Sequence, residues 1–244
     1  YLSVDLASYG LTEESTNAEI TEVFGENPRL SATFDKDSTQ NFEQGLKDIY
    51  RKLRPGEPAT FESAYDLIEA LFFDAKRYDL AKVGRYKYNK KLGLRNRIQG
   101  CTLAEDVIVP QTGELLYEAG RFMGKEEAEA IENSGVEYVF VYSKLHEDQK
   151  VKVIGNNFVD PAKYVDIDLT PYRLSEKVFY PVLMDIIEKA DGDEDKLKSL
   201  IAAGRKELSP KHIIIEDVIA SISYLINLSC GVGETDDIDH LSNR

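Results

Sequence analysis

The sequence has no tryptophan, and its 244 residues include only two cysteines and three histidines. Cys101 and Cys230 lie far apart and belong to no C-x-x-C pair, so we expect two buried free thiols instead of a redox or zinc motif. His146, His212 and His240 are equally scattered and give no support for a metal site. No apolar run approaches the roughly 18 residues that a membrane-spanning helix needs.

Several motifs of enzymes are also missing. The sequence contains no G-x-x-x-x-G-K-[ST], G-x-G-x-x-G, G-x-S-x-G or H-E-x-x-H pattern, and no nucleophile and base that could be paired by spacing. The carboxylates Asp166 and Asp168 are interpreted as outward positions of a strand. No secretory signal is visible. The chain opens at Tyr1 and stops at Arg244, and we expect it to be a cytoplasmic piece cut from a longer chain.

The net charge of −14 disfavours nucleic acid as a partner, but the charge is unevenly distributed. Residues 76–97 form a basic island that contains a single acid, Asp79. Its nine cations are Lys76, Arg77, Lys82, Arg85, Lys87, Lys90, Lys91, Arg95 and Arg97. Such an island could follow a DNA backbone, with Tyr86 and Tyr88 interleaved, or form an ordinary solvated surface.

Helical and β patterns alternate along the chain. Residues 41–53 have the apolar spacing of a helix, and a rigid turn follows at 54–58. Thr60 is an N-cap candidate for a second helix, whose apolar stripe is predicted to extend to Leu71 and Phe72. Gly84 and Gly93 are expected to interrupt helices. Strands are predicted at 107–117 (as a hairpin), 136–142, 150–154 and 164–169. Further helices are predicted at 125–133, 174–189 and 195–203, and after Ser209–Pro210 with Leu225 facing inward.

These patterns predict an α+β fold, in which a mainly helical lobe is interrupted by a β-rich inserted module. Residues 1–99 and 209–244 would form the discontinuous lobe, with 100–208 looped out as a separate body. We expect 100–208 to fold alone and, being acidic, not to bind DNA.

Four stretches, taken together and in order, resemble the β subunit of bacterial DNA-directed RNA polymerase. They are YRKLRPGEP (50–58), LFFDAKRYDL (71–80), VGRYKYNKKL (83–92) and DDIDHLSNR (236–244). The strings LAED (103–106), TGELL (112–116) and EAG (118–120) resemble the small β-β′ modules that recur in these subunits. Residues 100–208 are interpreted as a lineage-specific insertion.

The resemblance implies a lobe of the polymerase that contacts promoter and downstream DNA and the non-template strand. It implies no catalytic residue and no cofactor here, since the catalytic Mg²⁺ is bound by another subunit, so the fragment alone should be inactive. It also implies that Ile238, Asp239 and Arg244 line a pocket for an unpaired guanine. A carboxylate accepts the two adjacent donors of a guanine edge. Ser242 replaces a usual glycine, and where that glycine needs φ > 0 a serine carries a steric cost that shifts the loop.

Other DNA contacts are expected from the cations Arg54, Arg85, Lys87, Lys90 and Lys91. The implied partners are DNA, the β′, α and ω subunits and the sigma factor, with no membrane. An alternative function stays open, in which the acidic residues 100–208 dock a transcription factor or another subunit.

Overall fold

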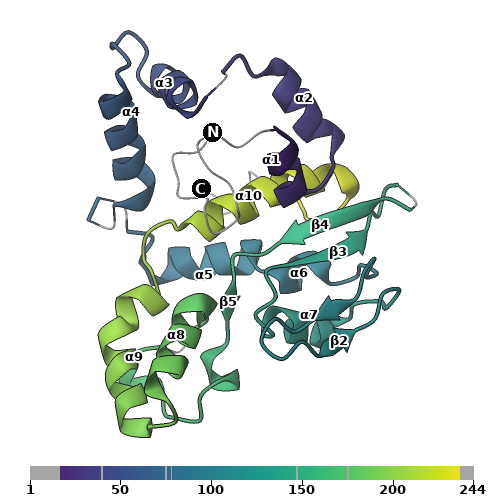
Figure 1. Ribbon diagram of the computed structural model, residues 1–244, viewed down its shortest axis with the longest axis vertical. Coiled ribbons are helices and arrows are strands. Elements are labelled where there is room, and N and C mark those ends of the chain that lie inside the picture. The colour runs from purple at the N-terminus through teal and green to yellow at the C-terminus, as the bar shows by residue number, and fades with distance from the viewer. Residues whose placement is uncertain are drawn as a thin grey trace. The chain divides into compact units, whose positions relative to one another are not determined.

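A computed structural model of the chain describes residues 17–39, 41–74, 76–77, 79–146, 148–174 and 176–236 (Figure 1). These residues divide into two compact units. The first reaches to Arg85 and includes Pro210–Val218, and the second comprises Tyr86–Ser209 and continues from Ile219. Two of the boundaries fall inside helices, within α5 (Ala81–Leu92) and α10 (Ile215–Asn227). Helices and small antiparallel sheets together confirm the predicted α+β class.

The first unit is helical. Its elements are α1 (Asn17–Phe24), α2 (Pro28–Lys36), α3 (Phe42–Leu53), α4 (Phe61–Ile68) and the π-helical turn η2 (Glu69–Phe73). The side chain of Asn41 accepts a hydrogen bond from Gln44 N at 2.9 Å, and Thr60 accepts one from Ser63 N at 3.2 Å. These N-caps satisfy amide donors that have no partner inside the helix. The predicted starts of α3 and α4 are therefore confirmed.

A small core joins α3 to α4. Leu46 and Tyr50 of α3 are buried against Ala64 and Ile68 of α4. The predicted apolar stripe nevertheless ends early, because Leu71 and Phe72 are 43% and 38% exposed. Both residues belong to η2, where Asp74 N donates to Glu69 O at 3.0 Å, an i→i+5 bond. This wider turn rotates later side chains away from the face that a 3.6-residue period predicts.

A buried ion pair closes the first unit. Arg85 Nη1 donates to both carboxylate oxygens of Asp217 at 2.9 and 2.7 Å, and the two side chains are 3% and 1% exposed. Arg85 Nε donates to Pro210 O at 2.8 Å, and Nη2 donates to His212 O. The guanidinium thus joins α5 to the segment before α10, because its planar fork suits several acceptors at once.

The second unit carries three two-stranded antiparallel sheets. They pair β1 (Val107–Ile108) with β2 (Leu115–Tyr117), β3 (Tyr138–Tyr142) with β4 (Lys150–Ile154), and β5 (Phe158–Val159) with β6 (Val178–Phe179). The predicted 107–117 hairpin and the strands at 136–142 and 150–154 are confirmed. In the longest pair Phe140 lies opposite Lys152, so Val139 and Val141 point to the other, buried face.

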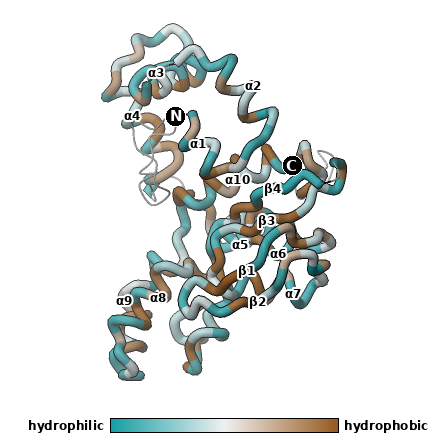
Figure 2. The backbone as a smooth tube through the Cα atoms, turned by 45° about the vertical axis from the view of Figure 1, so that its right-hand side comes forward, coloured by the Kyte–Doolittle hydropathy of each residue, from teal (hydrophilic) through white to brown (hydrophobic). Residues whose placement is uncertain are grey.

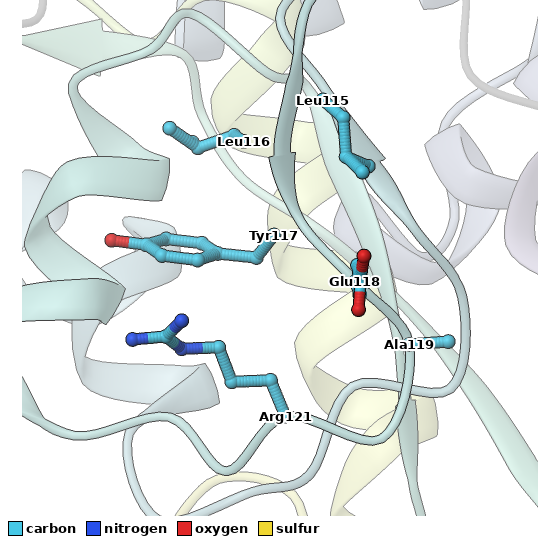
Figure 3. A pocket seen from close by; sticks show the side chains of 6 residues that line it. All are labelled: Leu115, Leu116, Tyr117, Glu118, Ala119 and Arg121. Carbon is cyan, nitrogen blue, oxygen red and sulfur yellow. The ribbon is translucent and has the colours of Figure 1, made fainter.

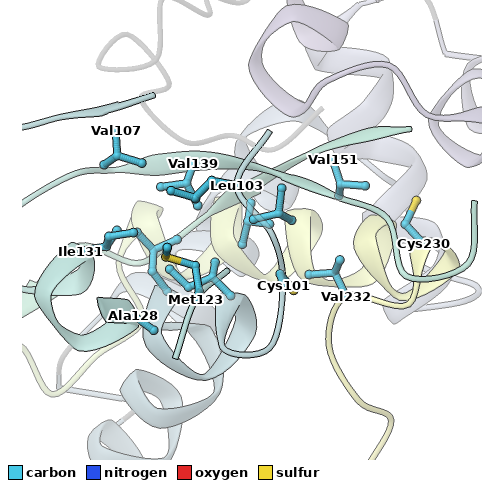
Figure 4. Packing of buried hydrophobic residues seen from close by; sticks show 14 residues of the cluster. Cys101, Leu103, Val107, Met123, Ala128, Ile131, Val139, Val151, Cys230 and Val232 are labelled. Carbon is cyan, nitrogen blue, oxygen red and sulfur yellow. The ribbon is translucent and has the colours of Figure 1, made fainter. Parts of the chain in front are cut away.

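One hydrophobic core of the second unit lies between the β3–β4 sheet and two helices, α6 (Leu94–Ile98) and α7 (Lys125–Glu132) (Figure 4). Leu103, Met123, Ile131, Val141 and Val153 are fully buried there. Both cysteines belong to this core and are free thiols, as predicted. Burial raises the pKa of the Cys101 thiol.

A second core joins α8 (Tyr180–Ala190) to α9 (Glu194–Leu208), which lie side by side (Figure 1). Leu183, Ile186, Ile201 and Leu208 are buried in it. The tube in Figure 2 alternates between brown and teal along both helices, as amphipathic helices require.

The strand predicted at 164–169 is wrong. The chain forms the 3₁₀ turns η3 (Pro161–Lys163) and η4 (Thr170–Tyr172) around it instead. Asp160 and Asp168 accept hydrogen bonds from backbone amides two residues ahead, at 3.1 and 2.9 Å. Such Asx bonds favour turns over strands.

The hydrophobic core of the β3–β4 sheet includes residues from both sides of the predicted boundaries of 100–208. Leu94, Ile98, Cys230 and Val232 lie outside 100–208, yet they share one buried cluster with Leu103. Residues 100–208 are therefore not a separate packed body, and cutting them out would remove part of their own core. The assignment of these residues as an insertion in the family's sequence is a different matter and stays a prediction.

Two helix boundaries also differ from expectation. Gly84 lies inside α5 instead of interrupting it, since a single glycine costs a helix only about 1 kcal/mol; Gly93 does separate α5 from α6. Ser209 ends α9, and α10 begins at Ile215, where Asp217 accepts from Ile214 N at 3.1 Å. Leu225, predicted to be buried, is 63% exposed.

Removing the acid of the buried pair should destabilise the chain strongly. We expect Asp217→Ala to lower the free energy of unfolding by about 3–5 kcal/mol, because Arg85 would keep a buried charge without its counter-ion. Urea unfolding of the purified chain measures this. The control is Asp48→Ala, which breaks the exposed pair with Lys52 and should change stability by less than about 1 kcal/mol. Equal losses in the two variants would contradict the structural role of Arg85–Asp217.

Candidate nucleic-acid interface

The predicted guanine pocket falls at the end of the chain. The structure describes the end of the chain only as far as Asp236. Ile238, Asp239, Ser242 and Arg244 therefore lie outside the described residues. The structure does describe the segment that leads into them, residues 231–236, and the groups in the second unit that hold this segment.

Tyr224 of α10 holds the backbone of Glu234 from both sides. The tyrosine hydroxyl donates to Glu234 O at 2.7 Å and accepts from Glu234 N at 2.8 Å. A phenol can do both because it has one donor and free lone pairs. Gly233, just before, has a φ of +103°, a conformation that side chains rarely adopt. Tyr224 as a residue is 9% exposed and therefore buried.

Lys91 of α5 binds the same segment at a second point. Its Nζ donates to Glu234 O at 3.0 Å and to the Asp236 carboxylate at 2.7 Å, and it lies 4.9 Å from the centre of the Tyr224 ring. Partial burial acts to lower the pKa of Lys91, but the bonds to Asp236 and Tyr224 outweigh it and raise that pKa. Lys91, predicted to contact DNA, is thus engaged with the segment that precedes the pocket residues.

Arg97 of α6 lies beneath this arrangement and is only 2% exposed. It donates through Nη1 to Ile154 O and through Nη2 to Ser223 Oγ at 3.0 Å, and its Cζ is 5.3 Å from the Tyr224 ring centre. Burial lowers the pKa of Arg97 to about 10, so it stays charged at neutral pH. The concentration of cations in the basic island does not indicate that Arg97 is buried and bonded inside the second unit.

One face of α5 is left for solvent. Tyr86 is 54% exposed, and Lys87 and Lys90 are exposed beside it. Asn89 and Leu92 lie on the other face and are buried. This division follows from helical spacing, which places positions three and four apart on one side. Among the described residues of the second unit that were predicted to contact DNA, Lys87 and Lys90 lie on the exposed side of α5, whereas Lys91 is engaged by Glu234 and Asp236.

Two residues of the first unit that were predicted to contact DNA, Arg85 and Arg54, differ in exposure. Arg85 is enclosed by its bonds to Asp217, Pro210 and His212, so its assignment to DNA contact is corrected to a structural role. A buried guanidinium with its donors already engaged cannot reach a phosphate. Arg54 ends α3, and its side chain is 52% exposed and 3.5 Å from Glu57, a weak surface pair that leaves it accessible.

A hollow that the sequence did not suggest lies along β2 (Figure 3). It has a volume of about 500 Å³ and is lined by Leu115, Leu116, Tyr117, Glu118, Ala119 and Arg121. The Arg121 guanidinium lies 4.6 Å from the Tyr117 ring centre. Ile108 and Leu115, opposite each other in the β1–β2 pair, are 55% and 51% exposed. This surface combines exposed apolar groups with one cation.

Comparison with known proteins shows the family to which the chain belongs. The family model described as RNA polymerase Rpb2, domain 2, matches residues 26–109 and 203–244, and the chain belongs to this family. Relatives that match 94% of the chain are named DNA-directed RNA polymerase subunit beta. They include those of Clostridioides difficile (52% identical over 229 residues), Alkaliphilus metalliredigens (51% over 229) and Acetivibrio thermocellus (51% over 231). The resemblance seen in the sequence is confirmed.

The same comparisons bear on residues 100–208. An alignment of 229 residues must include most of this segment, so these bacterial relatives share it. The chain spans 18% of the length of these relatives.

Two kinds of feature are absent from the part of the chain that the structure describes. It contains no cluster of three or more His, Cys, Asp or Glu side chains that could hold a metal ion. None of its helices is both long and apolar enough to cross a membrane.

Proposed function

We propose that this chain forms a non-catalytic lobe of the β subunit of a DNA-directed RNA polymerase, in contact with promoter and downstream DNA and with the non-template strand. The observation that carries the proposal is the exposed face of α5. There Lys87 and Lys90 flank Tyr86, in a chain whose overall charge is −14 and whose relatives are polymerase β subunits. The partners are the β′, α and ω subunits and sigma factor, and the catalytic Mg²⁺ belongs to another subunit.

The chemistry of this face suits a nucleic-acid backbone. Lysine ammonium groups neutralise phosphates and release condensed counter-ions, which supplies affinity without reading sequence. An exposed tyrosine offers a ring on which an unpaired base can stack. Acidic surfaces elsewhere on the chain would repel DNA and so disfavour non-specific contact away from the basic positions.

Sequence reading is assigned to the end of the chain. We propose that Asp239 accepts the N1–H and N2 amino donors of an unpaired guanine, with Ile238 as an apolar wall and Arg244 stacked on the base or bound to a phosphate. The other three bases do not offer that pair of donors to one carboxylate. The support is the DDIDHLSNR motif at 236–244 and the fixed segment that precedes it.

Reversing the charge of the α5 face should weaken DNA binding. For an intact polymerase with Lys87→Glu and Lys90→Glu, we expect duplex affinity near 0.1 M salt to fall at least about tenfold. The slope of log affinity against log salt should fall by about 2, since each phosphate contact contributes about 0.9. Fluorescence anisotropy over a salt series measures both.

The matched control for that experiment has the same change in net charge. Lys189→Glu with Lys198→Glu alters two lysines of α8 and α9 that already pair with acids on their own helices. If the control weakens binding as much as the α5 variant does, general repulsion explains the effect and the α5 face is not the interface.

Base reading has its own test. In the intact polymerase, Asp239→Ala should reduce the preference for guanine at the pocket position by about 1–3 kcal/mol, the scale of one bidentate base contact, and leave catalysis intact. Arg244→Ala should weaken all four bases more evenly, because stacking and phosphate contact carry little base identity. Bubble templates with each base at that position provide the measurement. An unchanged guanine preference in Asp239→Ala would remove Asp239 from the pocket.

A second candidate function is protein docking through residues 100–208. The hollow beside β2 and the exposed Ile108, Leu115 and Phe122 favour it, the last being 63% exposed. Arg121 over Tyr117 adds a directional cation to this apolar surface. Aromatic and arginine side chains such as Phe122, Tyr117 and Arg121 are enriched at protein interfaces.

Polar substitution of the β2 surface should then weaken a protein contact and spare DNA binding. We expect Leu115→Ser with Phe122→Ser to lower the affinity of the polymerase for sigma factor or another subunit about tenfold, as loss of an interface anchor does. Titration with purified, labelled partners measures this. Leu145→Ser, which alters a leucine that is 64% exposed on the β3–β4 turn, is the control. Unchanged affinity for every partner would reject the docking function.

A further inference from the structure

We propose that the outward face of the β3–β4 sheet binds single-stranded nucleic acid, with bases stacked on aromatic rings and phosphates held by lysines. The side chains of this aromatic face are Tyr138, Phe140 and Tyr142 of β3 and Lys150 and Lys152 of β4. The site goes beyond the proposed function, whose DNA contacts lie on α5 and at the end of the chain. Its ligand class includes DNA and RNA, since single strands of both present unpaired bases beside phosphates.

The register of the sheet gathers these side chains on one surface. Phe140 lies opposite Lys152, and Tyr142 lies opposite Lys150. Directly opposed residues project to the same side of a sheet. The valines that alternate with them, among them Val139, point into the buried core instead (Figure 4). Aromatic and cationic side chains therefore share the face that the core does not use.

The aromatic rings are partly exposed and fixed in place. Tyr138 is 45% exposed, and Phe140 and Tyr142 are half-buried. The rings of Tyr138 and Phe140 meet edge to face with their centres 5.8 Å apart. A ring held in this way can receive an unpaired base with little loss of side-chain entropy. Nucleic-acid-binding sheets stack bases on aromatic side chains displayed on one face, and such stacking accepts every base.

Lys152 places a cation beside the rings. Its Nζ lies 4.2 Å from the centre of the Tyr138 ring and 6.0 Å from that of Phe140. A nucleotide whose base contacts one of these rings therefore has its phosphate within reach of the ammonium group. Lysines that neutralise phosphates supply affinity that falls with salt. The combination of ring and cation fits a nucleotide better than it fits an apolar peptide.

Glu105 modulates the second lysine. Its Oε1 lies 2.9 Å from Lys150 Nζ, and the two side chains are 45% and 50% exposed. The bond to Glu105 raises the pKa of Lys150, which stays charged. A surface pair of this kind is weak, so a phosphate can replace the carboxylate. The acidic composition of 100–208 predicts no DNA binding, but that prediction averages over the segment, whereas these lysines lie together beside three rings.

The experiment measures the anisotropy of labelled oligo(dT) and oligo(U) of about 15 nucleotides, within the site size of one such domain, on the purified chain. Tyr138→Ala should weaken binding about fivefold or more, as loss of one stacked base does, whereas Tyr138→Phe keeps the ring and should keep the affinity. Lys152→Ala should lower the slope of log affinity against log salt by about 0.7. The control is Tyr65→Ala, which removes a 38% exposed tyrosine of α4 and should change nothing.

Glu105→Gln should strengthen binding. It releases Lys150 and removes a negative charge near the face, so we expect a gain of about two- to fivefold in affinity, the range of one surface ion pair. Glu194→Gln makes the same change of charge in an exposed pair with Lys198 on α9 and is the control. An equal gain in both variants would show that net charge alone sets the affinity, which would overturn the assignment of Lys150.

Location is tested in the intact polymerase. Photocross-linking with iodouracil-substituted oligonucleotides should modify the peptide that contains residues 138–142, and no cross-link there would overturn the proposal. So would equal losses in Tyr138→Ala and Tyr65→Ala, or an equal loss of duplex affinity in Tyr138→Ala. Binding of polyglutamate that depends on Lys152, with unchanged oligonucleotide affinity in Tyr138→Ala, would assign the face to an acidic protein instead.

Two further comparisons identify the ligand and separate this site from the proposed function. Affinity for oligo(dT) that depends on Tyr138 supports a DNA strand, and such affinity for oligo(U) alone supports RNA. The variant with Lys87→Glu and Lys90→Glu should lower duplex affinity and leave cross-linking at 138–142 unchanged. Failure of the α5 interface and failure of the aromatic face therefore give different results.

Discussion

Polar side chains buried on α10 are the constraint from which much of the described architecture follows, because a buried polar atom must find a hydrogen-bond partner. In the first unit, Asp217 finds it in Arg85, which is 132 residues away in the sequence. In the second unit, Ser223 accepts from Arg97 and from a backbone amide of β4, and Asn227 donates to a β4 carbonyl at 3.0 Å. Apolar burial alone would let this helix turn or slide. These directed bonds fix which residue of α10 faces which segment.

The parts of the fold that could be predicted are those governed by neighbouring residues. Asn41 and Thr60 cap the helices that follow them, and the 107–117 hairpin turns where proline and glycine allow it. Features that depend on remote partners could not be found in this way. The local spacing that placed Leu71 in a buried stripe takes no account of a π-helical turn. The boundary predicted between residues 99 and 100 lies just before the first β structure, yet the core formed there also includes Leu94 and Val232 from outside 100–208.

The sequence predicts which residue types are concentrated in the candidate site, but not which of their side chains face solvent. The sequence reveals a concentration of cations, and the family resemblance supplies a reason for it. Which of these cations face solvent depends on acceptors far along the chain: Arg85 and Arg97 turn inward, and Lys91 turns to Asp236. Lys87 and Lys90 are exposed for the complementary reason, since helical periodicity places them away from the buried Asn89 and Leu92. Tyr224 carried no signal in the sequence beyond its apolar surroundings.

The burial of Cys101 has a practical consequence. Its thiol lies in the core of the second unit with a raised pKa, so at neutral pH it is protonated and shielded, and the thiolate is the species that alkylating reagents attack. Reaction must wait until the core opens far enough to admit both water and reagent. The rate at which Cys101 is alkylated therefore counts openings of the second unit. Alkylation of Cys101 can therefore be used to measure the rate of local unfolding in a chain that has no tryptophan to report it by fluorescence.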